Sequence, residues 1–318
     1  MRLTTLGFVM LAAYGLSWLI TPPEANTTDL PRLPGAVLLV GYPPDSLFLT
    51  LDQRTIDLQA HDGAQSLIRP SISLDGNIVA SARSAVSDGS APSPGLIVST
   101  YSVAEKKWTA YKDLEVAVGS VAISADGSKV ACITRTMPAA PSGLRILDLK
   151  TGKITDGPGM QERSGSSISW SPDGRRLALD MGAERPNDSI TDPLRRAIYI
   201  VNIDTRAVSR IADGMSPSWS PSGQWIAFVN HAEESKESKF QFCLMRPDGK
   251  DSQVLSTFRS DVVPYLKPVW SPDSKLLLIN KSRNPDLDTW DIEIIDVATH
   301  EVNRRFSSVP PVFGWASP

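Results

Sequence analysis

The sequence predicts an all-β chain that folds as a six-bladed β-propeller of four-stranded blades. Three observations lead to this prediction. A strand–turn–strand unit, clearest at residues 168–179, recurs along the chain. The copies follow one another roughly every 45–50 residues, a period typical of propellers. The two ends of the chain each carry part of a blade, and together they complete a ring.

The turn of the repeated unit has the residues that a tight hairpin needs. After Trp170 come Ser171, Pro172, Asp173 and Gly174. Proline presets φ for its position, aspartate can accept hydrogen bonds from the following backbone, and glycine adopts a positive φ without steric cost. The flanking residues are apolar or alternate with polar ones, so the unit is predicted to be a β-hairpin.

The copies can be aligned on the residue that corresponds to Trp170, which we call the motif position. It is occupied in turn by Ile72, Ile123, Trp170, Trp219, Trp270 and Trp315. Eight residues further on, a small side chain recurs in four of five copies, at Ala80, Ala131, Ala178 and Ala227. A small side chain repeated inside a strand predicts the close approach of a neighbouring blade.

The N-terminal part of the propeller begins in the middle of a blade. Strands are expected at residues 36–41, 46–52 and 55–59, and no repeated hairpin precedes them. At the other end, residues 311–318 form an opening strand with nothing after it. We therefore expect one composite blade, with its inner strand from the C-terminus and its outer three from the N-terminus. Closure of this kind removes unpaired sheet edges.

Each complete blade follows one pattern of strands A to D. The hairpin supplies A and B, and strand C is expected at residues 96–101, 144–149, 197–202, 240–245 and 291–296. The A–B and C–D turns are short and lie on one face of the ring. The B–C loops and D–A connections lie on the other face and are longer and irregular. Variable loops on a rigid scaffold usually carry function, so we expect the binding surface on this loop face.

The N-terminus differs in composition from the rest of the chain. Arg2 precedes an uncharged apolar run at residues 6–20. This pattern predicts a signal peptide or an N-terminal membrane anchor within residues 1–20. Both stay open, since the run just reaches the lower limit of about 17 residues for a membrane span. Residues 21–35 are rich in proline and are expected to form a linker, and residues 36–318 the propeller.

Either alternative predicts an exported protein. We expect it in the periplasm or on the extracellular face of the membrane, secreted or N-terminally anchored, with contact to the membrane only through residues 1–20. The net charge of −3 gives no signal for binding a polyanion, so no nucleic-acid partner is expected.

The search for catalytic chemistry is negative. The sequence has no nucleophile elbow and no glycine-rich phosphate loop. We therefore expect a protein that is not an enzyme, with no catalytic residue, no resident metal and no cofactor. Cys132 and Cys243 fall on blades that are not neighbours, so they are expected to be buried free thiols.

Three further groups of residues have a weak functional interpretation and a plainer structural one. The histidines lack metal-ligand spacing and are expected to be solvated. The acidic cluster could bind a cation but lacks the glycine of a dedicated calcium loop. The Asn-x-Ser/Thr triplets are glycosylation candidates only in an exported eukaryotic protein. These groups are His61, His231 and His300; Asp286, Asp288 and Asp291; and Asn26, Asn187 and Asn280.

Cations and tyrosines recur in the segments expected on the loop face, and both residue types are common in interaction hot spots. Together they could form a binding rim, or they could be dispersed solubilising side chains. The candidates are Tyr42, Arg69, Arg83, Arg135, Arg163, Arg259, Tyr265 and Lys267.

The segments at 170–179, 219–228 and 270–278 resemble the repeats of TolB-type propellers. The resemblance covers residues 36–318 and implies a six-bladed propeller, an exported location and a role in protein–protein contact. TolB, a periplasmic component of the Tol–Pal envelope system, has an α/β domain before its propeller, whereas only a linker and the apolar segment precede it here. Similar repeats also occur in the propellers that gate prolyl-oligopeptidase-type enzymes.

These observations lead to one expectation and one alternative. We expect a monomeric, exported propeller that binds a protein or peptide, such as another envelope protein, through the loop face. The alternative is a propeller that binds a small ligand or carbohydrate, or an enzyme, with its site at the mouth of the central channel. A cation in that channel also remains an alternative.

Overall fold

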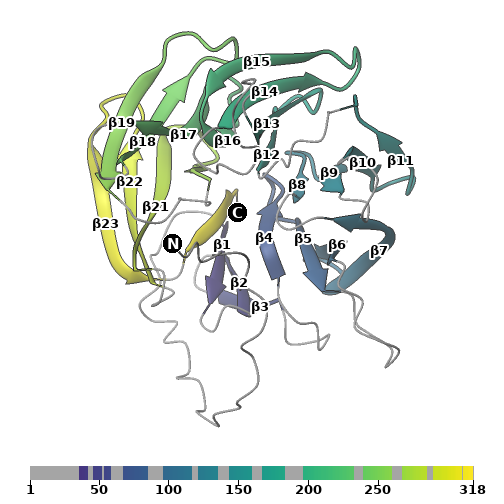
Figure 1. The fold of residues 1–318 in the computed structure, drawn as a ribbon. Helices are drawn as coiled ribbons and strands as arrows, with labels where there is room; N and C mark the ends of the chain where they lie inside the picture. Colours follow the sequence, from purple (N-terminus) through teal and green to yellow (C-terminus); the bar gives the residue numbers. More distant parts are fainter. Residues whose placement is uncertain are drawn as a thin grey trace, which may run out of the picture.

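A computed structural model describes most of the chain after residue 35. The described residues are 36–41, 46–51, 54–58, 67–84, 96–116, 121–134, 143–159, 167–182, 196–232, 239–259, 267–284, 289–309 and 311–317. They form four-stranded antiparallel sheets arranged around a common axis (Figure 1). The predicted signal peptide or anchor and the linker lie outside this part of the chain.

The described strands make six sheets, which we call blades 1 to 6. Five of them are built from four consecutive strands, and blade 1 combines the two ends of the propeller. From the axis outwards, blade 1 contains β24 (Val312–Ala316), β1 (Ala36–Gly41), β2 (Ser46–Leu51) and β3 (Arg54–Asp57). Blade 2 contains β4 (Leu67–Ile72), β5 (Ile78–Ser84), β6 (Leu96–Ser102) and β7 (Lys107–Val116).

The other four blades repeat the same order. Blade 3 contains β8 (Val121–Ile123), β9 (Lys129–Thr134), β10 (Gly143–Asp148) and β11 (Ile154–Asp156). Blade 4 contains β12 (Ile168–Trp170), β13 (Arg176–Gly182), β14 (Arg196–Asn202) and β15 (Val208–Asp213). Blade 5 contains β16 (Met215–Trp219), β17 (Ile226–Ala232), β18 (Lys239–Met245) and β19 (Gln253–Arg259). Blade 6 contains β20 (Val269–Trp270), β21 (Leu276–Asn284), β22 (Thr289–Asp296) and β23 (Val302–Val309).

Blade 1 joins the two ends of the propeller. β24 pairs with β1 in antiparallel register, with Val37 opposite Trp315 and Ala36 opposite Ala316. Figure 1 shows the yellow C-terminal strand beside the purple β1. The expected strand bounds differ slightly from the observed ones: the third N-terminal strand covers residues 54–57 rather than 55–59, and strand C of blade 6 begins at Thr289 rather than Asp291.

The repeated turn is held by side-chain hydrogen bonds that involve its serine and aspartate. In blade 4, Ser171 Oγ donates to Asp173 Oδ1 at 2.5 Å and accepts from the backbone N of Arg176 at 2.9 Å. Gly174 has a φ of 64°, as the turn type requires. The same two bonds recur at Ser73, Ser124 and Ser271. The turn is therefore a self-contained unit in which few side chains set the geometry.

The hydrophobic core is divided among the interfaces between neighbouring blades. Each of its six clusters combines residues of two adjacent blades. Ala178 of blade 4, for example, packs with Trp219 and Phe228 of blade 5. The other three predicted small residues also face the next blade, which confirms the interpretation of the small side chain.

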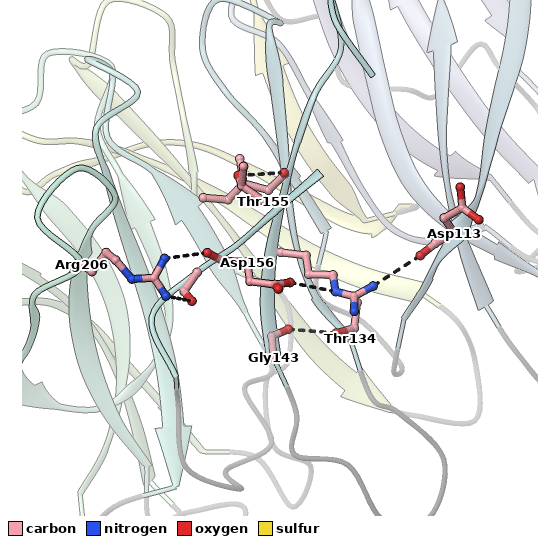
Figure 2. A network of polar contacts seen from close by, with 9 residues as sticks. Asp113, Thr134, Gly143, Thr155, Asp156 and Arg206 are labelled. Carbon is pink, nitrogen blue, oxygen red and sulfur yellow. Dashed lines mark hydrogen bonds and ion pairs between the residues drawn. The ribbon is translucent and has the colours of Figure 1, made fainter. Parts of the chain in front are cut away.

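Polar contacts also join blades on their outer parts (Figure 2). Arg206, in the C–D turn of blade 4, donates to the carbonyl oxygens of Asp156 at 2.9 Å and Gly157 at 2.6 Å in blade 3. Arg145 of blade 3 pairs with Asp156 at 3.2 Å and donates to the carbonyl of Asp113 in blade 2 at 3.5 Å. These contacts are exposed, so they add little stability each, but they link three successive blades.

Candidate functional site

The described residues line an open cavity on the propeller axis, with a volume of about 120 Å³. We call it the axial cavity. All six inner strands contribute to its wall. The residues at the motif position all line it, and four of the six are tryptophans: Ile72, Ile123, Trp170, Trp219, Trp270 and Trp315.

Serines one residue before the motif position connect the wall of the cavity. Ser169 Oγ accepts a hydrogen bond from the backbone N of Trp219 at 2.9 Å, and Ser71 Oγ accepts one from the backbone N of Ile123 at 3.3 Å. Each bond joins the inner strands of two neighbouring blades. The wall is therefore fixed by direct bonds between blades as well as by packing.

The cavity has two chemically different ends. At the hairpin end, where the inner strands finish, the lining comprises the apolar residues Leu74, Ala125, Pro172 and Pro221 together with Ser220. At the loop end, where the inner strands begin, Lys267 lies just before β20. Its Nζ donates to the carbonyl of Ile168 at 3.2 Å. Since Lys267 belongs to blade 6 and Ile168 to blade 4, this bond reaches past blade 5.

Lys267 is the only one of the eight predicted binding residues whose side chain the structure describes. It is half-buried and lines the axial cavity. Arg69, Arg83 and Arg259 lie in β4, β5 and β19, but only their backbone is described. The other four predicted residues lie outside the described part of the chain: Tyr42, Arg135, Arg163 and Tyr265. The binding rim on the loop face therefore stays a prediction.

A buried carboxylate lies beneath the loop end. Asp180, in β13, has no exposed surface. It accepts hydrogen bonds from the backbone N of Ser167 at 2.9 Å and of Ser216 at 2.8 Å, and from Arg196 Nη2 at 3.2 Å. Ser216 has a φ of 54°, which is uncommon for a residue other than glycine. Asp180 thus holds the beginnings of two inner strands, one in its own blade and one in blade 5.

An asparagine repeats this arrangement between blades 6 and 1. Asn280 lies ten residues after its motif position, as Asp180 does, and is 1% exposed. It donates to the carbonyl of Val312 at 2.9 Å and accepts from the backbone N of Val312 at 3.0 Å. Val312 occupies the same position in β24 as Ser216 in β16. We call this contact the interblade latch.

Sequence reasoning missed both the latch and the part that the tryptophans play in the cavity wall. A signal for the latch was present, because Asp180 and Asn280 are polar residues at one repeat position within otherwise apolar strands. Asn280 had instead been considered as a glycosylation candidate. Its burial and its two backbone bonds leave its amide inaccessible in the folded chain.

The remaining titratable candidates lie away from the cavity. Cys132 and Cys243 are free and buried, as predicted, and burial raises the pKa of each thiol to about 12. His231, at the end of β17, packs against the ring of Phe240 with centroids 5.3 Å apart. His300 lies in the C–D turn of blade 6, and its backbone N donates to Asp296.

Two other functional features are absent from the described ranges. No group of three His, Cys, Asp or Glu residues is placed to hold a metal ion. Asp286 and Asp288 of the acidic cluster lie outside these ranges. No helix in the same ranges is long and apolar enough to span a membrane.

Comparison with known proteins shows the fold. No protein-family profile matches the sequence, and no curated protein matches it. Among solved structures, TolB from Acinetobacter baumannii superposes with a TM-score of 0.65 at 15% identity, covering 92% of this chain and 69% of that one. A putative TolB from Agrobacterium tumefaciens gives a TM-score of 0.51 at 16% identity, covering 82% and 88%. An oligogalacturonate lyase in complex with manganese gives 0.56 at 16%, covering 85% and 73%.

These similarities extend over most of the chain, and their low identities carry information on the fold alone. The chain has the β-propeller fold found in TolB. The same fold occurs in a lyase, and propellers in general host many unrelated functions. The function must therefore be argued from the axial cavity and its lining.

Proposed function

We propose that this protein is an exported propeller scaffold that binds a protein partner by taking a short segment of it into the axial cavity from the loop end. The observation that carries the proposal is the size of the cavity. Its volume of about 120 Å³ is well below the roughly 300–1,000 Å³ of typical small-molecule sites. A cavity below this range suits a single side chain better than a sugar chain.

The chemistry of the wall supports the same proposal. Indole rings, prolines and aliphatic side chains supply apolar surface, while backbone groups and Lys267 supply a few polar partners. Aromatic side chains provide much contact area at low entropic cost and are common in interaction hot spots. Because bonds between blades hold the wall, binding would need little rearrangement of the scaffold.

The first described residue, Ala36, pairs with Ala316 at the hairpin end of the axial cavity. Export itself is proposed from the apolar N-terminal segment and from the resemblance of the repeats to TolB-type propellers.

A second candidate function is carbohydrate binding, with or without catalysis, at the cavity mouth. It is favoured by the fold that the chain shares with an oligogalacturonate lyase. The long loops of the loop face would then have to extend the site, since the described cavity by itself is too small for an oligosaccharide.

Affinity capture from an envelope extract with the full-length chain tests the proposal. Three variants would be compared with the parent. Lys267→Trp narrows the loop end of the cavity, and Ala125→Trp narrows the hairpin end. The double variant Arg163→Glu/Arg259→Glu alters the predicted rim. We expect the parent to retain a protein that Lys267→Trp loses and Ala125→Trp keeps.

The other outcomes would overturn part or all of the proposal. Capture that is lost only with the double arginine variant would place the site on the rim of the loop face instead of the cavity. Capture of no protein by the parent, together with a thermal shift on addition of oligogalacturonate and manganese, would favour the carbohydrate function. Circular dichroism on each variant would show that the propeller has kept its fold.

A further inference from the structure

We propose that Arg206 keeps the outer edge of blade 3 from pairing with another strand, and that without Arg206 this edge pairs with the same edge of a second copy of the chain. The surface lies on the outside of the ring, away from the axial cavity (Figure 1). The outermost strand of each blade has a neighbouring strand of its sheet on one side only. The backbone N–H and carbonyl groups on its other side can pair with a strand of another molecule.

Most outer strands carry a β-bulge, which makes such pairing difficult. The register shifts where β7, β15, β19 and β23 pair with the strand inside them. A bulge leaves a residue unpaired and bends the strand, so the edge no longer presents an even row of backbone groups. The other two outer strands, β3 and β11, pair with their inner neighbours in an unbroken register over their described residues.

Both of these regular outer strands are covered at their ends by a side chain of the next blade. Just after β3, the carbonyl of Leu58 accepts a hydrogen bond from Trp108 Nε1 of blade 2 at 2.7 Å. At the end of β11, the carbonyls of Asp156 and Gly157 accept from Arg206 of blade 4 at 2.9 Å and 2.6 Å (Figure 2). Trp108 is part of the core, whereas Arg206 is exposed and can be replaced without disturbing the packing.

Arg206 bonds to a backbone group that faces away from the sheet. Lys153 and Gly157 make backbone bonds to β10. Residues of an antiparallel strand bond to one neighbour at every second position, so Ile154 and Asp156 present their N–H and carbonyl groups outward. The side chain of Asp156 is 78% exposed, which shows that this edge is open to solvent next to the Arg206 bonds.

The sequence of this edge suits pairing with a copy of itself. If two copies meet in antiparallel orientation about a two-fold axis at Thr155, Ile154 of each copy lies opposite Asp156 of the other. The outward N–H and carbonyl groups of these two residues then face each other. Lys153 lies opposite Gly157. No like charges are directly opposed, so the pairing avoids the repulsion that destabilises such contacts.

The backbone at Arg206 allows the side chain to be removed without damage to the turn. Its φ is 61°, a conformation that glycine adopts more easily than arginine. Gly152 occupies the same position in the C–D turn of blade 3, with a φ of 71°. Arg206→Gly therefore fits the turn, and its effect on association can be measured in a folded protein.

Analytical ultracentrifugation of the full-length chain tests the proposal. We expect Arg206→Gly to dimerise at a concentration at least about tenfold lower than the parent does, because two hydrogen bonds from a charged group no longer compete with strand pairing. Arg206→Met, which lacks the donors without adding the flexibility of glycine, should behave in the same way. The matched control is Arg210→Met, on an exposed arginine that pairs with Asp213 on its own strand, and it should associate no more than the parent.

Hydrogen exchange locates the contact. The amides of Ile154 and Asp156 should exchange rapidly in the parent and become protected in the Arg206→Gly dimer. In the double variant Arg206→Gly/Asp156→Pro, proline removes one outward N–H and no bond inside the sheet, as an edge strand allows. This double variant should return to the monomer.

Several results would overturn the proposal. The first is an Arg206→Gly variant that associates no more than the parent. The second is a dimer in which the amides of Ile154 and Asp156 exchange as they do in the monomer. The third is a dimer that forms equally with Arg210→Met, which would assign association to the loss of surface charge. Circular dichroism and thermal unfolding on each variant would show that association does not follow from unfolding.

Discussion

The two halves of the ring hold their blades together near the axis by different means. In blades 4 to 6, whose repeats carry Trp-Ser-Pro, indole groups donate to the preceding blade. Trp170 Nε1 donates to the carbonyl of Ala122 and Trp270 Nε1 to that of Ser218, each at 3.0 Å. In blades 1 to 3, bonds between two backbones are present in addition to the bond from Ile123 N to Ser71 Oγ. Ser317 N donates to Leu74 O at 2.7 Å, and Leu74 N donates to Ala125 O at 2.9 Å.

Tryptophan and proline are both absent from the repeats of blades 2 and 3. Leu74 and Ala125 occupy the positions of Pro172 and Pro221. Proline has no N–H, so a backbone bond of the Leu74 type cannot form from its position. Where proline stands, an indole N–H in the same repeat can supply a bond between blades instead. Trp219 is an exception, since its Nε1 donates to Gly223 in its own turn at 3.3 Å.

The comparison predicts that truncation of an indole has the largest effect on stability. Trp270→Ala should lower the free energy of unfolding by about 3–5 kcal/mol, because it leaves a cavity between blades 5 and 6. Trp270→Phe keeps most of the ring and should cost about 1 kcal/mol through loss of the bond to Ser218. Urea denaturation measures both. A cost for Trp270→Phe equal to that of the alanine variant would contradict the packing account.

The interblade latch should have the next largest effect. Asn280→Leu leaves the buried N–H and carbonyl of Val312 without their partner, so we expect a loss of about 1–3 kcal/mol. The matched control is Ile279→Leu, at the neighbouring buried residue of β21, which keeps the volume of the side chain. A change of this kind should cost less than about 1.5 kcal/mol. Equal losses for both variants would show that the latch adds nothing beyond packing.

The contribution of the backbone bonds in blades 1 to 3 can be tested by introducing a proline there. Leu74→Pro removes the N–H that donates to Ala125 and should cost about 1 kcal/mol. The turn itself accepts proline at this position in three other blades. Pro221→Leu in blade 5 is the control and should leave the denaturation midpoint nearly unchanged. If Leu74→Pro left the free energy of unfolding unchanged, the backbone bond between Leu74 and Ala125 would not stabilise blades 1 to 3.

The smallest expected effect concerns the aspartates of the turns. For Asp273, hydrogen bonds from Ser271 and the backbone of Lys275 lower the pKa below its ordinary value of 3.8, although burial opposes them. In Asp173, burial raises the pKa, but bonds from Ser171 and Arg175 outweigh it and the pKa is again lowered. A carboxyl group with a lower pKa in the folded state stabilises the fold above the unfolded pKa. That contribution is lost as the pH falls through the folded value.

Acid unfolding measures this contribution. Asp273→Asn should lower stability slightly at neutral pH, where the folded carboxylate contributes, and should flatten the fall in stability below about pH 4. Blade 5 offers an internal control, since Ser222 replaces the aspartate there and Ser222→Ala should not alter the pH dependence. If stability fell as steeply at low pH in Asp273→Asn as in the parent, the turn carboxylates would not contribute to acid sensitivity.

Local patterns in the sequence were enough to predict the hairpins, the composite blade and the packing between blades. Residues such as Pro172, Gly174 and Ala178 act within a few positions of their own strand, so the repeat reveals them directly. The latch at Asp180 was also within reach, since it recurs at one repeat position. The contact was not predicted because the repeat shows the polar residue in strand B but not the backbone group to which it bonds.

The geometry of the candidate site could not be read in this way. Lys267 of blade 6 and Ile168 of blade 4 are 99 residues apart in the sequence. Neither repeat contains a pattern that predicts their hydrogen bond. Lys267 had been selected only as one cation among several on the loop face. Its place at the cavity depends on where the connection before β20 brings the chain to the axis, which is a property of the closed ring.

The most direct test of the account is photo-cross-linking in the intact full-length protein. Benzoylphenylalanine would replace Phe313, which lines the axial cavity, and in a second protein Val254, which is 50% exposed on β19 at the outer edge of blade 5. We predict that irradiation in envelope extract cross-links one partner protein at position 313 and not at position 254. Cross-linking of the same partner at 254 alone, with none at 313, would contradict a binding site in the axial cavity.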